Sequence, residues 1–222
     1  MDVSLIYDKL FFLQEEYNAK TNISRIRTKD DFLIKHIYDS LVLTPLLKEF
    51  QVKTLVDVGT GAGYPGIPLA IADPALKIFL NETSAKKIRY LNHVKNVLNL
   101  QNVVILAGRV EDIARLSENR EKFGAATARA LADLTVLLEY LSPLVEVGGH
   151  LFLLKGKDIE NEITKADSAA KTLGLLLSDV RKYSLEGNGR SLLIYKKEKN
   201  CPKIYPRKAG MAIKRPLLRG AD

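Results

Sequence analysis

The spacing of hydrophobic positions changes near residue 50. Before that point, apolar residues recur at helical intervals over 4–17 and 30–47, which predicts two helical stretches. Beyond it, short apolar runs alternate with amphipathic stretches. The runs predict strands over 54–58, 77–80, 103–106, 125–128, 150–154, 175–183 and 192–195. The amphipathic stretches predict helices over 67–72, 85–98, 133–141 (with Asp133 as the N-cap) and 158–173.

This alternation of strands and helices predicts an α/β fold, with a mostly parallel seven-stranded sheet covered by helices. The last two strands are connected near Gly187-Asn188-Gly189, which predicts an antiparallel strand at one edge of the sheet. We expect three regions. They are an N-terminal helical extension over 1–50, a central domain over 51–197 and a basic C-terminal tail over 198–222.

Composition narrows the class of protein. Apolar residues make up 46% of the chain and charged residues 27%, which is typical of a globular protein and excludes a wholly disordered one. The single cysteine, Cys201, excludes an internal disulfide and a zinc site built from cysteines. No apolar run is long enough to span a bilayer, and no export signal is visible at the N-terminus. We therefore expect a cytoplasmic protein without a membrane partner.

Positive charge is concentrated at the C-terminal end. The net charge is +8, and residues 196–222 carry nine basic and two acidic residues, which leaves a nearly neutral body. Such a tail indicates an arm that contacts a polyanion such as nucleic acid, and the alternative is a solvated terminus that only aids solubility. The basic residues are Lys196, Lys197, Lys199, Lys203, Arg207, Lys208, Lys214, Arg215 and Arg219.

The clearest motif is the glycine-rich segment 57–66, which follows a predicted strand and opens a predicted helix. Its glycines fit the G-x-G-x-x-G pattern of dinucleotide enzymes, and they also fit the acid-x-Gly-x-Gly-x-Gly pattern of S-adenosylmethionine enzymes, with Asp57 as the acid. An acid at that place suits a cofactor with an ammonium group and would repel a pyrophosphate, which favours the methyl donor. Glu82, at the end of the second strand, can accept both ribose hydroxyls in either class.

The chain contains several further sequence blocks in the same order as a known family. With these blocks it resembles the bacterial 16S rRNA guanine-N7 methyltransferase G family, once called glucose-inhibited division protein B. The resemblance covers nearly everything from residue 20 onward. Its blocks are Thr21–Ser24, His36–Leu41, Asp57–Ala70, Lys86–Leu91, Gly108–Glu111, Arg120–Phe123, Ala128–Ala130, Leu154–Lys157 and Tyr205–Gly210.

The resemblance implies a Rossmann-like methyltransferase that moves a methyl group from S-adenosylmethionine to N7 of a guanine in the decoding-region loop of 16S rRNA. The partner would be 16S rRNA or a precursor of the small ribosomal subunit, and we expect a monomer. Two alternatives remain from the residues alone. One is a small-molecule or protein methyltransferase on the same fold, and the other is a non-catalytic RNA-binding protein that merely holds a nucleotide.

Candidate site residues come from the motifs and from the resemblance together. The expected cofactor-binding residues are Gly59, Gly61, Tyr64, Glu82, Val110, Glu111 and Arg129, and the expected catalytic residues are Arg129, Lys155 and Arg190. Structural roles are the alternatives for four of them: an ion pair for Arg129, a solvated strand-end lysine for Lys155, a turn position for Arg190 and packing under the loop for Tyr64.

The expected chemistry needs few functional groups. Guanine N7 has an in-plane lone pair and no proton, so it can attack the methyl group in line without a general base, and catalysis then depends on positioning. A cytosine C5 methyltransferase needs a thiolate, but the only cysteine lies in the tail. The Pro-Pro motif of exocyclic-amine methyltransferases is absent after the fourth strand, where Thr127–Ala130 stands. We expect no metal.

Overall fold

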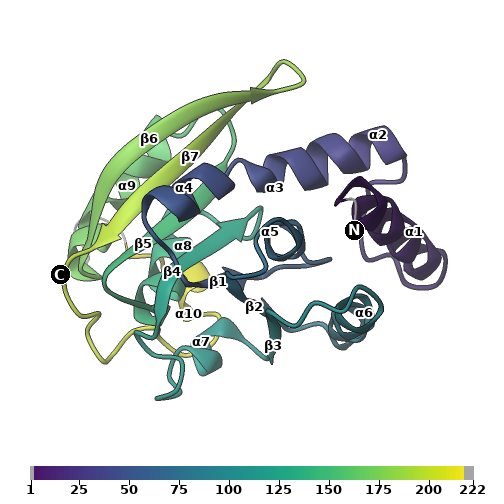
Figure 1. Cartoon of the computed structure of the whole chain (residues 1–222). Coiled ribbons are helices and arrows are strands. Elements are labelled where there is room, and N and C mark those ends of the chain that lie inside the picture. The colour runs from purple at the N-terminus through teal and green to yellow at the C-terminus, as the bar shows by residue number, and fades with distance from the viewer. Residues whose placement is uncertain (1–2, 218–222) are drawn as a thin grey trace. The chain divides into compact units, whose positions relative to one another are not determined.

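The computed structural model describes residues 3–217 (Figure 1). The chain divides into two compact units, Met1–Ala107 and Gly108–Asp222. The boundary between these units differs from the boundaries expected at residues 50 and 197. The division into three regions therefore stays a prediction from the sequence. Over residues 3–217, no helix combines the length and apolar character needed to cross a membrane.

The first unit contains three parallel strands in the order β3-β2-β1: β1 (Thr54–Val58), β2 (Lys77–Glu82) and β3 (Val103–Ala107). Thr54 pairs with Lys77, and Ile78 pairs with Val103. The last four residues of β1 are buried, as expected for a parallel strand covered on both faces. The strands expected over 54–58, 77–80 and 103–106 are confirmed.

Helices of the first unit lie before and between these strands. They are α1 (Val3–Thr21), α2 (Lys29–Phe32), a π-helical turn η1 (Leu33–Tyr38), α3 (Asp39–Leu41), α4 (Thr44–Glu49), α5 (Gly66–Ala72) and α6 (Ala85–Val97). The helix α1 packs against α5 and α6. Two contacts fix this packing: the Tyr7 hydroxyl donates to the Pro68 carbonyl at 3.3 Å, and the rings of Tyr17 and Tyr90 meet edge to face at 5.1 Å.

The second unit contains the remaining strands, in the order β4-β5-β7-β6. The strands are β4 (Phe123–Arg129), β5 (Val145–Lys155), β6 (Leu175–Leu185) and β7 (Asn188–Lys197). Strands β4 and β5 are parallel, whereas β7 is antiparallel to both β5 and β6. The antiparallel pairing expected at the sheet edge is confirmed, with β6 outermost, and Figure 1 shows β6 and β7 as a long paired ribbon.

Helices of the second unit are α7 (Val110–Ile113), α8 (Leu134–Leu141), a 3-10 turn η2 (Ser142–Leu144), α9 (Glu160–Thr172) and α10 (Met211–Lys214). Asp133 occupies the N-cap position of α8, but its side chain makes no capping bond. The Leu134 N–H donates instead to Glu162 Oε2 at 3.0 Å, so an acid from α9 takes the place of the expected cap.

The connection between β6 and β7 falls near the expected glycines but is shorter than expected. The turn between β6 and β7 consists of Glu186 and Gly187, which have φ angles of 49° and 75°. A two-residue turn with both φ angles positive matches the twist of a hairpin. Asn188 and Gly189 therefore belong to β7, and Arg190 lies in that strand opposite Tyr183 rather than in a turn.

The C-terminal tail is packed over much of its length and is not a free arm. Tyr205 is buried, and the Arg120 guanidinium donates to the Cys201 and Tyr205 carbonyls, both at 2.8 Å. Lys197 is fully buried and donates to the Ser142 carbonyl at 2.6 Å. The alternative of a solvated terminus is therefore wrong for this part, because its polar groups have partners within the protein, and contact of the tail with a polyanion stays a prediction. Exposed cations remain at Lys196, Lys199, Lys203, Lys208, Lys214 and Arg215, and Arg219 lies outside the described residues.

Candidate functional site

The glycine-rich loop after β1 is held together by Asp57. Its carboxylate is fully buried, and Oδ2 accepts hydrogen bonds from the Thr60 hydroxyl at 2.6 Å and from the Gly66 N–H at 2.9 Å. These bonds connect the end of β1 to the first residue of α5. The acid of the motif therefore acts as part of the frame of the loop.

Glycines in this loop serve two different purposes. Gly59 and Gly61 have φ angles of 66° and 64°, the left-handed region that favours glycine. A Cβ on Gly66 would lie 2.2 Å from Leu80 Cδ2, so this glycine is needed for close packing of α5 on β2. A Cβ on Gly61 would meet only Lys87 Nζ at 3.8 Å and the Gly59 carbonyl at 4.0 Å. The loop therefore presents an uncrowded backbone surface at Gly61.

Glu82 ends β2 beside this loop and is buried. Its Oε1 accepts from the N–H groups of Thr83 at 2.7 Å and Ser84 at 2.9 Å, which fixes the carboxylate. Its Oε2 accepts from the Gly61 N–H at 3.0 Å and lies 3.8 Å from Lys87 Nζ. A carboxylate oxygen has more than one lone pair, so Oε2 keeps capacity to accept a hydroxyl.

The side chain of Tyr64 is buried against the N-terminal helical region. Its hydroxyl donates to Gln14 Oε1 at 2.9 Å, and its ring stacks on that of His36 at 3.9 Å with an interplanar angle of 7°. His36 Nε2 in turn lies 3.0 Å from the Ser24 hydroxyl. Tyr64 thus connects the loop to three N-terminal segments.

In the second unit, Val110 and Glu111 begin α7, directly after Gly108 and Arg109, and both are buried. Glu111 Oε1 accepts from the Gly210 N–H at 2.9 Å, so the C-terminal segment contacts this residue directly. Burial raises the pKa of Tyr140 to about 12, and the neighbouring carboxylate of Glu111 adds to the increase. Both residues follow β3, and their role in cofactor binding stays a prediction.

Arg129 and Arg190 can be placed by strand register. Arg129 ends β4 opposite Leu154, and Leu154 is opposite Leu192, two residues along β7 from Arg190. Because side chains alternate along a strand, Arg129 and Arg190 lie on one face of this sheet, and Lys155 lies on the other. The register thus does not bring the three predicted catalytic residues to one face.

Lys155 has internal partners. Its Nζ lies 2.7 Å from Glu162 Oε2 and donates to the Ala132 carbonyl at 3.2 Å, and only 12% of the side chain is exposed. The expected alternative, a solvated strand-end lysine, is wrong. Since Glu162 also accepts from the Leu134 N–H, the pair fixes the segment between β4 and α8.

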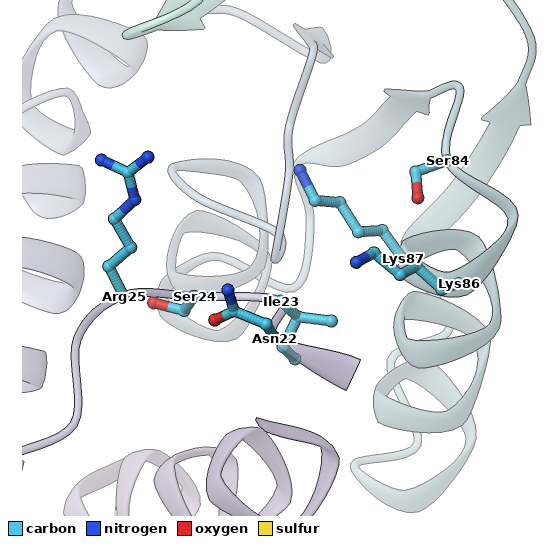
Figure 2. Close-up of a pocket in the computed structure, with 7 residues that line it drawn as sticks. All are labelled: Asn22, Ile23, Ser24, Arg25, Ser84, Lys86 and Lys87. Atoms are coloured by element: carbon cyan, nitrogen blue, oxygen red, sulfur yellow. The ribbon is translucent and has the colours of Figure 1, made fainter. Parts of the chain in front are cut away.

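The structure also contains a polar pocket of about 420 Å³ in the first unit, which the sequence did not predict (Figure 2). It is formed by the segment after α1 and by the start of α6, where two blocks of the resemblance, Thr21–Ser24 and Lys86–Leu91, contribute lining residues. Its lining residues are Asn22, Ile23, Ser24, Arg25, Ser84, Lys86 and Lys87.

Two observations bear on chemistry elsewhere in the chain. Burial raises the pKa of the Cys201 thiol, which agrees with its not being a nucleophile. Over residues 3–217, no cluster of three or more His, Cys, Asp or Glu side chains could hold a metal ion.

The residues of the first unit fit a nucleoside cofactor. A buried carboxylate with a free acceptor site, Glu82, stands beside the accessible loop backbone at Gly61. This arrangement suits a ribose, whose two hydroxyls are donors, and the loop leaves space for close approach.

Solved structures show which class of protein has this fold. The O-methyltransferase TomG of Streptomyces achromogenes is similar with a TM-score of 0.60 and 13% identity, over 87% of this chain and 90% of that one. A 16S rRNA (adenine(1408)-N(1))-methyltransferase of Catenulisporales acidiphilia is similar with a TM-score of 0.54 and 17% identity, over 67% and 86%. The fold is therefore that of the Rossmann-like methyltransferases.

Sequence comparison gives the particular family. The model of the family described as rRNA small subunit methyltransferase G matches residues 8–192. Ribosomal RNA small subunit methyltransferase G of Clostridium botulinum is 41% identical over 96% of this chain and 89% of its own length. The protein of that name from Leuconostoc citreum is 42% identical over 95% and 90%. The chain belongs to the rRNA small subunit methyltransferase G family, whose members are S-adenosylmethionine-dependent enzymes.

Proposed function

We propose that this enzyme transfers a methyl group from S-adenosylmethionine to N7 of a guanine in the 16S rRNA of the small ribosomal subunit. The observation that carries the proposal is the pairing of the glycine loop with the buried carboxylate of Glu82, in a chain that belongs to this family. When bound, S-adenosylmethionine supplies an electrophilic methyl group next to a sulfonium.

Loop residues would bind and orient the donor. Gly59 and Gly61 let the backbone approach it, Glu82 accepts its ribose hydroxyls, and Val110 and Glu111 contact the base. Tyr64 would act by fixing the loop against α1 and the π-helical turn, because its hydroxyl and its ring face both have partners within the protein.

Guanine N7 would attack the methyl carbon in line. The donor would supply the methyl group and keep the electron pair of the broken C–S bond on its sulfur, while the N7 lone pair would form the new N–C bond and the purine would take the positive charge. No proton moves, so no side chain has to act as a base. Arg129 would hold the guanine or the carboxylate of the donor, since a guanidinium donates two parallel hydrogen bonds.

Lys155 and Arg190 would contribute in different ways. Lys155, through Glu162 and Ala132, would position the segment that follows Arg129. Arg190, on the same face as Arg129, would contact the RNA. The proposal includes a monomeric enzyme in the cytoplasm that acts without a metal.

Transfer of tritium from labelled S-adenosylmethionine tests the proposal. The acceptors are small ribosomal subunits, naked 16S rRNA and guanosine monophosphate, offered at equal concentrations of guanine. We expect label in the RNA of one or both ribosomal samples and none in the mononucleotide. Transfer to the mononucleotide at the same rate would favour a small-molecule methyltransferase, and donor binding without transfer would favour a non-catalytic RNA-binding protein.

A further inference from the structure

The pocket of the first unit is formed by two segments far apart in the sequence. One side comes from the chain just after α1, and the other from the first turn of α6. Figure 2 shows Arg25 on the first side, the two lysines Lys86 and Lys87 on the other, and Asn22 between them. Three cationic side chains thus surround one pocket.

The segment after α1 is held in place by a buried amide. Asn18 Oδ1 accepts from the N–H groups of Ile23 and Ser24, both at 3.0 Å. The Ser24 hydroxyl accepts from the Ile26 N–H at 3.2 Å. This side of the pocket is therefore preformed, and Arg25 projects from an ordered backbone.

Charge in the pocket is only partly neutralised. Lys87 lies 3.8 Å from Glu82, but within residues 3–217 neither Arg25 nor Lys86 has an ion-pair partner. The positive end of the α6 dipole adds to the same region, where the Ser84 side chain makes no capping bond. A ligand that fits this pocket is an anion.

Size and position indicate which anion. A volume of about 420 Å³ accommodates a phosphate with part of a sugar, and Arg25 and Lys86 are exposed, so a polymer can reach them. S-adenosylmethionine carries a net positive charge and would be repelled. The pocket also borders the loop, because Lys87 Nζ lies near both Glu82 and the surface of Gly61.

We propose that this pocket binds a backbone phosphate of the RNA substrate, through Arg25 and Lys86, close to the nucleotide that is methylated. This inference rests on the proposed function for the identity of the RNA. Lys87 also lines the pocket, but it lies 3.8 Å from Glu82 and therefore belongs to the part of the pocket next to the donor site. The contact adds affinity for RNA and takes no part in bond making.

Direct binding tests the inference without relying on activity. The affinity of fluorescently labelled enzyme for small ribosomal subunits is measured between 50 and 200 mM KCl, for the wild type, Arg25→Gln, Lys86→Gln and the double variant. Each lost phosphate contact reduces the salt slope by about 0.7–0.9, and the double variant should bind about tenfold more weakly at low salt. Donor affinity should not change.

Arg89→Gln is the matched control, because Arg89 is an exposed cation of α6 that does not line the pocket. Arg89→Gln should leave the salt slope at the wild-type value. Lys86→Arg, which keeps the positive charge, should also give the wild-type slope that Lys86→Gln loses. A double variant with the wild-type slope overturns the inference, as does a slope that Arg89→Gln lowers equally.

A free anion is the competing ligand, and inorganic phosphate is its probe. If the double variant loses calorimetric binding of phosphate while its salt slope for subunits stays unchanged, the pocket takes a free anion and the RNA assignment is wrong. Failure of the proposed function has a different signature: the wild type binds subunits with a steep slope but transfers no methyl group.

Discussion

Arg207 and Glu139 form a bidentate ion pair between the C-terminal segment and α8. Arg207 Nη2 lies 2.6 Å from Glu139 Oε2, and Arg207 Nε lies 3.0 Å from Oε1. The Arg207 N–H also donates to Oε1 at 2.9 Å. Only 1% of the Glu139 side chain is exposed, and its hydrogen bonds raise the pKa of the arginine. A tail cation therefore serves the fold.

Removal of Arg207 should destabilise the protein, because it leaves the Glu139 carboxylate buried without its partner. We expect Arg207→Ala to lower the free energy of unfolding by about 3 kcal/mol, measured by urea denaturation. Lys208→Ala removes the same charge from an exposed neighbour and should stay within about 0.5 kcal/mol of the wild type. Equal effects of the two changes would show that the pair contributes nothing specific.

The carboxylate of Glu82 should determine donor affinity. Glu82→Ala removes a buried acceptor and leaves the Gly61 N–H without its partner, so binding of S-adenosylmethionine should weaken by about 1–3 kcal/mol. Calorimetric titration measures this, and a thermal melt separates it from unfolding. An unchanged dissociation constant in a folded variant would remove Glu82 from the cofactor site.

Two glycines of the loop should respond differently to the same substitution. Gly66→Ala puts a Cβ 2.2 Å from Leu80 Cδ2, whereas a Cβ at Gly61 makes only ordinary van der Waals contacts and costs the strain of a left-handed conformation. We expect a loss of about 1 kcal/mol for Gly61→Ala and a larger loss for Gly66→Ala. The reverse order in urea denaturation would contradict the packing role of Gly66.

Arg129 should affect methyl transfer more than folding. It ends β4 on the face it shares with Arg190, and Arg129→Ala should lower kcat by at least tenfold with the thermal melt unchanged. Measured donor affinity decides its role: a loss there alone would assign Arg129 to cofactor binding and not to the acceptor. A rate within twofold of the wild type would leave it a structural residue.

Local pattern predicted most of the fold. The strand at 54–58 was predicted with its observed bounds, because a short β-branched run that ends in glycines leaves little freedom for another structure. The helix expected over 85–98 is observed over 85–97, because its apolar residues recur at helical intervals. The place of the glycine loop after β1 and of Glu82 at the end of β2 could also be predicted, since each follows from the short strand before it.

Tertiary pairing is what the sequence did not reveal. Counting charges cannot tell which cations pair internally, and Arg207 and Lys197 were assigned to a free tail for that reason. A signal was present in α8, where Glu139 stands among apolar residues and every residue of the helix is buried. A buried acid requires a partner. Arg190 was predicted to lie in a turn because Gly187-Asn188-Gly189 resembles a longer connection than the two-residue turn observed.

The central claim is that the methyl group goes to guanine N7 of 16S rRNA. Small ribosomal subunits that lack the modification are incubated with enzyme and S-adenosylmethionine, and the RNA is reduced with borohydride and treated with aniline. Methylation at N7 makes the ring cationic and reducible, so the chain breaks there. We predict one enzyme-dependent break at a guanine, together with 7-methylguanosine in the nucleoside digest. Incorporated label with no break and no 7-methylguanosine would contradict the account.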